Sequence, residues 1–83
     1  MLQVIFSRTF EKSFTKLPPR QMAKVQKVIE DFANEKVSEK MRLYELRGSL
    51  AGVWSLSVGG DLRIHFEYVG ESSINLINVG THA

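Results

Sequence analysis

Residues 53–68 read VWSLSVGGDLRIHFEY and contain the pattern that decides the fold. On both sides of a central turn, apolar side chains alternate with small, polar or charged ones, as in strands that bury one face. The turn is Gly59-Gly60-Asp61, where glycine adopts positive φ angles without steric cost. The stretch therefore predicts an antiparallel β-hairpin with one apolar face and one polar face.

A third strand is predicted after this hairpin. Gly70-Glu71-Ser72 has the composition of a turn, and residues 74–79 form a further run that suits a strand. The apolar face of the sheet is expected to carry Trp54, Leu56, Leu62, Ile64, Phe66, Ile74 and Leu76. We interpret these side chains as core residues without a chemical role.

The first 34 residues predict a strand and two helices. Residues 2–6 are apolar and β-branched, and Ser7 then stands at an N-cap position. Two apolar stripes at helical spacing follow, and Pro18-Pro19 ends the first helix and opens the second. The stripes consist of Phe10, Phe14 and Leu17, then Met22, Val25, Ile29 and Phe32. The predicted fold is α+β with the order β-α-α-β-β-β, a two-helix N-terminal hairpin packed on an antiparallel sheet.

Length and composition narrow the class of protein. A chain of 83 residues has room for one domain, which we expect to span residues 1–83. The absence of cysteine excludes disulfides and thiolate metal sites, and two histidines alone argue against structural zinc. The N-terminus lacks the basic segment of a signal peptide, and no stretch has the length of a membrane span. A cytoplasmic location is therefore the expectation.

The charges are unevenly distributed along the chain. Residues 1–29 hold six basic groups and one acid, whereas residues 30–83 hold five basic groups and eight acids. The six are Arg8, Lys12, Lys16, Arg20, Lys24 and Lys27. For any one of them a solvated helix face is the simpler explanation, but together they favour a polyanionic partner.

Polar side chains on the predicted sheet are the candidates for chemistry. Arg63 either pairs with a carboxylate, for which Glu67 on the same face is a candidate, or binds a phosphate. The imidazole of His65 suits acid–base chemistry, although a lone histidine on a sheet more often has no such role. His82 follows the last predicted strand, and Asp61 stands in a turn that aspartate also favours for local reasons.

Several short motifs in a fixed order resemble the RelE/ParE toxin superfamily, and its YafQ-like branch in particular. They are Leu46-Arg47-Gly48, Gly52-Val53-Trp54, Asp61-Leu62-Arg63-Ile64-His65-Phe66 and Val79-Gly80-Thr81-His82. The opening, with Phe6-Ser7-Arg8 and Phe10-Glu11-Lys12, is also similar. The resemblance covers nearly the whole chain and rests on the combination and order of the motifs. It implies a RelE-like fold.

The resemblance also implies a function. Such proteins are toxins of bacterial type II toxin–antitoxin systems, and many are mRNA interferases, endoribonucleases that cleave mRNA on the ribosome without a metal or other cofactor. On this basis His82 is expected to act as general acid or base, Asp61 as an acidic catalytic residue and Arg63 as the transition-state-stabilising cation, with His65 as a further candidate. The expected partners are a cognate antitoxin, the ribosome and mRNA. The basic helices and Arg47 would contact RNA phosphates.

Two alternatives remain open. Where relatives carry basic residues or histidines on the strand before the turn, this chain has Ser55 and Ser57. That difference fits a ParE-like toxin that binds DNA gyrase and cleaves no RNA. It also fits a catalytically weakened member that binds an antitoxin or forms a homodimer, for which an exposed final strand would offer an edge.

Overall fold

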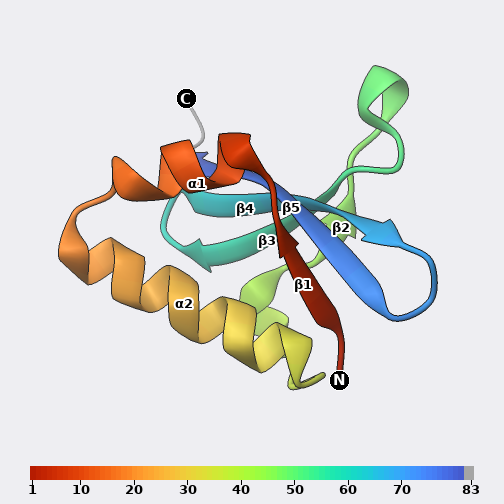
Figure 1. The fold of residues 1–83 in the computed structure, drawn as a ribbon, viewed down its shortest axis with the longest axis horizontal. Coiled ribbons are helices and arrows are strands. Elements are labelled where there is room, and N and C mark those ends of the chain that lie inside the picture. Colours follow the sequence, from red (N-terminus) through yellow and green to blue (C-terminus); the bar gives the residue numbers. More distant parts are fainter. Residues whose placement is uncertain (82–83) are drawn as a thin grey trace.

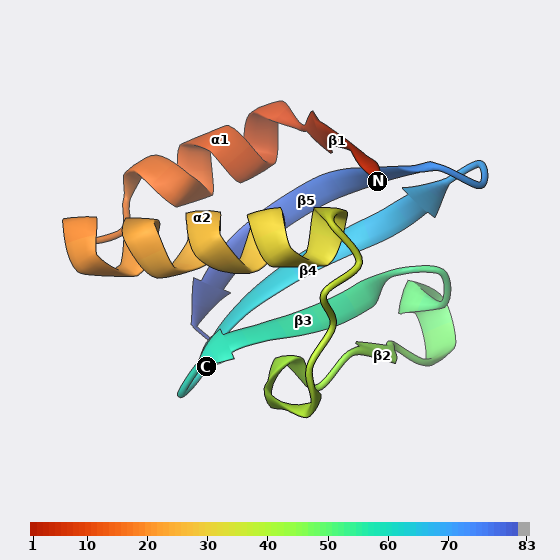
Figure 2. The same ribbon diagram turned by 90° about the horizontal axis from the view of Figure 1, so that it is seen from below.

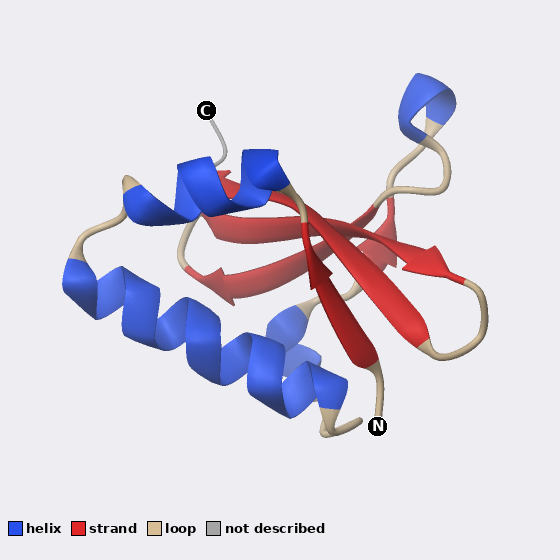
Figure 3. Ribbon diagram, viewed as in Figure 1, coloured by secondary structure: helices blue, strands red, loops and turns tan. Residues whose placement is uncertain are grey.

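The computed structural model describes residues 1–81. Its elements in chain order are β1 (Gln3–Phe6), α1 (Arg8–Thr15), α2 (Pro19–Ala33), the 3₁₀ turn η1 (Glu39–Met41), β2 (Tyr44–Glu45), the 3₁₀ turn η2 (Gly48–Leu50), β3 (Trp54–Gly59), β4 (Leu62–Val69) and β5 (Ser73–Thr81). Both helices lie on the same face of a single twisted sheet (Figures 1 and 3). The predicted α+β class and the helical hairpin before the sheet are confirmed.

The sheet has five strands in the order β1-β5-β4-β3-β2. The β3–β4 and β4–β5 pairs are antiparallel, as the hairpin pattern predicts. However, β1 pairs with β5 in parallel, so the expectation of a wholly antiparallel sheet is wrong. A fifth strand, β2, also pairs antiparallel with β3. The final strand is internal, because β1 and β4 flank β5, so the exposed final edge expected from the sequence does not exist.

The helix boundaries follow local chemistry. The hydroxyl of Ser7 accepts a hydrogen bond of 3.0 Å from the Phe10 amide and caps α1, as predicted. Pro19 is the first residue of α2, where its missing N–H costs nothing. Glu35 has a φ of 63° just after the C-cap Asn34, where the chain leaves the helix. Within residues 1–81 no helix is both long and apolar enough to cross a bilayer.

The core lies between the helices and the sheet (Figure 2). The apolar sheet face predicted from the alternation is confirmed, since its members are buried except for the half-buried Trp54. Phe66 from β4 contacts Phe32 from α2 with ring centroids 5.2 Å apart. Tyr68 packs edge-on against Phe66, and burial raises the pKa of its phenol. Met41 in η1 is also a buried part of the core, although the sequence analysis does not place it there.

Candidate functional site

Arg63 and His65 lie on the sheet face opposite the helices, as predicted. Their neighbours across the strands are small or polar: Ser57 and Gly80 flank Arg63, while Ser55 and Asn78 flank His65. Each of the three central strands therefore contributes to one polar patch. We call these six residues the β4 patch.

The β4 patch is less exposed than the alternation alone suggests. Ser55 is 0% exposed and Ser57 is also buried, so β3 presents two buried hydroxyl-bearing residues to β4. Within residues 1–81, the Oγ of Ser55 and the Nη1 of Arg63 are buried polar atoms without a hydrogen-bond partner. Such atoms are unfavourable for folding unless a ligand or water satisfies them. The patch thus contains two buried polar atoms whose hydrogen-bonding capacity the described residues do not use.

Gly80 leaves room on one side of the arginine. A Cβ atom added at this glycine would meet nothing within 4 Å. Gly80 on β5 and Ser57 on β3 both pair with Arg63. Small residues therefore stand on both sides of the long arginine side chain. The register therefore places no bulky side chain directly opposite Arg63 on either neighbouring strand.

Asp61 lies in the exposed turn between β3 and β4, at one end of the patch. The next residue, Leu62, pairs with Thr81, the last residue of β5. The register therefore brings the turn with Asp61 beside the end of β5. His82, the fourth residue with a predicted catalytic role, lies outside the described residues.

The predicted pairing of Arg63 with Glu67 is wrong. The two residues are four apart on one strand, a separation of about 13 Å along its axis. No ion pair joins them in the described part of the chain, where Glu67 instead stands opposite Asn75. The ligand-binding role of the Arg63 guanidinium stays a prediction.

The basic side chains predicted to contact RNA are all exposed, but they do not surround the β4 patch. Six of them are on α1 and α2 or in the linker between them, which cover the other face of the sheet (Figure 2). Lys27 forms an i,i+4 ion pair with Asp31 at 3.2 Å. Arg47 precedes η2 in a loop that projects away from the sheet (Figure 1). Any RNA contact by the helices would therefore be separate from contact with Arg63.

Two serines of the N-terminal part hold the β5 backbone in place. The sequence analysis did not identify either of them as a site residue. The β4–β5 register shifts between His65 and Phe66, so Ile77 has no partner on β4. The Ser7 hydroxyl donates to the Ile77 carbonyl at 3.0 Å, and the Ser13 hydroxyl accepts from the Val79 amide at 3.0 Å. These bonds attach α1 to β5 just before Gly80. The only local signal was the N-cap position of Ser7.

We expect Ser13→Ala to destabilise the protein by about 1–2 kcal/mol, because the Val79 amide loses its acceptor in a partly buried position. The measurement is urea unfolding of both proteins, followed by circular dichroism. Thr15→Ala is the matched control, since the Thr15 hydroxyl bonds only to the exposed Lys12 carbonyl and its loss should cost less than about 0.5 kcal/mol. Equal effects of the two substitutions would contradict the anchoring role of Ser13.

Comparison with known proteins gives further evidence for the superfamily. No family model matches the sequence, and no curated protein matches it significantly. Among solved structures, YafQ from E. coli superposes with a TM-score of 0.83 at 16% identity, covering 99% of this chain and 94% of YafQ. The YoeB/ParE toxin from Agrobacterium tumefaciens gives 0.81 at 15% identity, covering 99% and 100%. The RelBE2 toxin–antitoxin complex from Mycobacterium tuberculosis gives 0.73 at 28% identity, covering 98% of both chains. The chain therefore has the fold that RelE/ParE-type toxins share.

The superfamily resemblance predicted from short motifs is thus confirmed over the full chain length. The opening motif falls on β1 and α1, and the four other motifs fall on the projecting loop and the start of β3, on the start of β4, and on the end of β5. Two of these parts meet in the β4 patch, where Arg63 pairs with Gly80. The motif around Arg47 lies apart, in the projecting loop (Figure 1).

Proposed function

We propose that this chain is the toxin of a bacterial toxin–antitoxin pair and that it inhibits translation by cleaving mRNA on the ribosome. The observation that carries the proposal is the buried Nη1 of Arg63, which has no hydrogen-bond partner within residues 1–81 and whose residue pairs with Gly80, where there is open space. A guanidinium with unused donors suits a phosphate and the charge that builds up on it in a transition state. The toxin role is further supported by similarity to YafQ, solved with DinJ, and to RelBE2, a toxin–antitoxin complex.

In the proposed chemical step, all the bonds that form and break belong to the RNA and to acid and base groups of the protein. The 2′-oxygen attacks the neighbouring phosphorus while the bond from phosphorus to the 5′-oxygen breaks. A base accepts the proton of the 2′-hydroxyl, and an acid gives a proton to the departing 5′-oxygen. His82 and His65 are the proposed acid and base, because imidazole exchanges protons near neutral pH. Arg63 would bind the equatorial phosphate oxygens, and Asp61 would position or assist the acid–base pair.

The exposed cations on the helices suit long-range attraction to ribosomal RNA. Because they lie on the face opposite Arg63, they would contact RNA other than the cleaved strand. A particle with as much RNA surface as the ribosome offers phosphates to both faces of a small protein. The partner proposed for the toxin itself is an antitoxin protein, as in the DinJ–YafQ and RelBE2 complexes.

A second candidate function has one observation in its favour. Ser55 and Ser57 occupy the β3 positions beside His65 and Arg63, so β3 contributes no cation to the β4 patch. A toxin that binds DNA gyrase by surface contact would not need such cations. This candidate predicts growth inhibition with DNA damage and intact mRNA.

The test is to add the purified protein to ribosomes programmed with a defined mRNA and to map new 5′ ends by primer extension. We expect cleavage within the codon at the ribosomal A site, no cleavage of free mRNA, and loss of cleavage in His82→Ala. A folded wild-type protein that leaves the mRNA intact would overturn the proposal. A gyrase supercoiling assay on the same preparation distinguishes the second candidate.

A further inference from the structure

The strand β1 is an uncovered and apolar edge of the sheet. The opposite edge, β2, has only two residues and carries a charge at Glu45, two features that natural proteins use to prevent edge pairing. By contrast, β1 reads Gln-Val-Ile-Phe, without charge, proline or bulge. Ile5 is 46% exposed and Phe6 is 51% exposed. No other element covers the outer side of β1 in the two perpendicular views (Figures 1 and 2).

The unused backbone groups of β1 can be assigned from its pairing with β5. The amides of Gln3 and Ser7 donate to carbonyls of Ser72 and Leu76, at 2.8 and 3.2 Å. Because backbone groups alternate in direction along a strand, the N–H and C=O groups of Val4 and Phe6 point away from β5. The open edge therefore offers two donors and two acceptors, placed symmetrically about Ile5.

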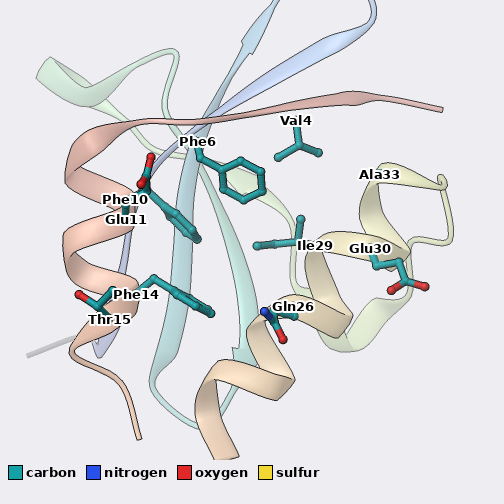
Figure 4. Close-up of a pocket in the computed structure, with 10 residues that line it drawn as sticks. All are labelled: Val4, Phe6, Phe10, Glu11, Phe14, Thr15, Gln26, Ile29, Glu30 and Ala33. Atoms are coloured by element: carbon teal, nitrogen blue, oxygen red, sulfur yellow. The ribbon is translucent and has the colours of Figure 1, made fainter. Parts of the chain in front are cut away.

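An apolar groove lies next to this edge. It has a volume of about 620 Å³ and is lined mainly by Val4, Phe6, Phe10, Phe14, Ile29 and Ala33. Figure 4 shows Val4 and Phe6 of β1 pointing into the same space as Phe10 and Phe14 of α1 and Ile29 of α2. Side chains of a strand added beside β1 would enter this groove.

We propose that β1 is a homodimer interface, in which β1 of a second copy pairs with it antiparallel about a two-fold axis at Ile5. In this register Val4 of each copy stands opposite Phe6 of the other. The two donors and two acceptors of each open edge then all form hydrogen bonds with those of the other copy. The two Ile5 side chains become directly opposed on the face away from the helices. Phe6 of each copy lies beside Val4 of the other, at the mouth of its groove.

Charge complementarity favours a second copy over an unrelated segment. The α2 end lies against the β1 start, because the Leu2 amide donates to the Ala33 carbonyl at 2.8 Å. Antiparallel pairing then brings Arg8, which begins α1, towards this α2 end of the other copy. The last turn of α2 contains no basic residue, and Glu30 there is exposed. A cation from the second copy complements both this carboxylate and the negative helix end, and the two-fold axis repeats the contact.

The test uses charges at position 5, analysed by sedimentation equilibrium over a concentration series. Wild-type protein is expected to dimerise, while Ile5→Lys and Ile5→Glu should each raise the dissociation constant at least about tenfold, since like charges become directly opposed. An equimolar mixture of the two variants should recover dimers, because lysine then faces glutamate. Val69→Lys is the matched control: Val69 is 43% exposed at the end of an internal strand and should leave dimerisation unchanged.

Three outcomes would overturn the proposal. Wild-type protein that stays monomeric at millimolar concentration would exclude self-association. That result would also be expected if the natural occupant of β1 is a different polypeptide. Dimers that persist in Ile5→Lys would place the interface elsewhere. Failure of the mixed variants to associate would reject pairing centred on Ile5. Circular dichroism of each variant verifies that the fold is retained, as expected for substitutions at a half-exposed position.

Discussion

Replacing Arg63 with alanine should slow mRNA cleavage on programmed ribosomes by roughly 10²–10³-fold, as for the loss of one preorganised donor to a developing anionic charge. The same substitution should leave the free energy of unfolding unchanged or slightly higher. The reason is that the buried Nη1 has no hydrogen-bond partner among residues 1–81, so its removal breaks no bond of that atom to this part of the chain. Lower activity together with undiminished stability would mark Arg63 as a residue kept for ligand binding.

Two further variants make this result specific. Arg63→Lys keeps the positive charge but loses the planar guanidinium, and its cleavage rate should fall between those of the wild type and Arg63→Ala. Lys40→Ala removes an exposed charge in η1, which is not part of the β4 patch and contributes the buried Met41 to the core, and it should change the rate less than about twofold. Single-turnover cleavage at saturating protein separates the chemical step from ribosome binding. If Arg63→Ala cleaves as fast as the Lys40 variant, Arg63 has no role in the reaction.

Local periodicity predicted most helices and strands of the fold, but it could not predict which distant strands pair with each other. Alternation identified β3, β4 and β5 and the side chains that they bury, because one face of these strands meets the helices. Nothing local in residues 3–6 specifies that they pair with residues 73–76, or in which direction. The two residues of β2 are too few for an alternating pattern. The buried Met41 was missed because charged neighbours surround it in the sequence.

For the candidate site, the sequence predicted which face of the sheet carries the polar side chains, but it did not predict which residues surround them. Alternation placed Arg63 and His65 together on the polar side, and the structure agrees. It did not predict that Ser55 is buried or that Arg63 stands between Ser57 and Gly80, because these neighbours come from the strand register. The hydrogen bond that the Val79 amide donates to the Ser13 hydroxyl could not be predicted either, since it joins residues 66 positions apart at an irregular point of β5. The sequence thus identified the candidate side chains, but it did not identify their neighbours on the adjacent strands.

The largest loss of stability is expected from Phe66→Ala, at about 3–5 kcal/mol. Phe66 is 0% exposed and contacts the rings of Phe32 and Tyr68 at 5.2 and 5.3 Å. A domain of this length has a total stability of roughly 4–12 kcal/mol, so the variant is expected to be partly unfolded at moderate temperature. Urea unfolding should show a much lower midpoint with an unchanged slope. Phe66→Leu, which removes less volume, should fall between wild type and Phe66→Ala.

The location of Phe66 also predicts which part of the molecule loosens. The Phe32–Phe66 contact joins α2 to the sheet, whereas α1 is additionally held by the hydroxyl bonds of Ser7 and Ser13 to β5. In Phe66→Leu, amide hydrogen exchange should therefore accelerate more in α2 than in α1. Leu50→Ala is the control, because Leu50 is 54% exposed in the projecting loop and its loss should change neither helix. Equal acceleration in both helices would mean that the hydroxyl bonds add nothing to the attachment of α1, and that the two helices are held to the sheet as one unit.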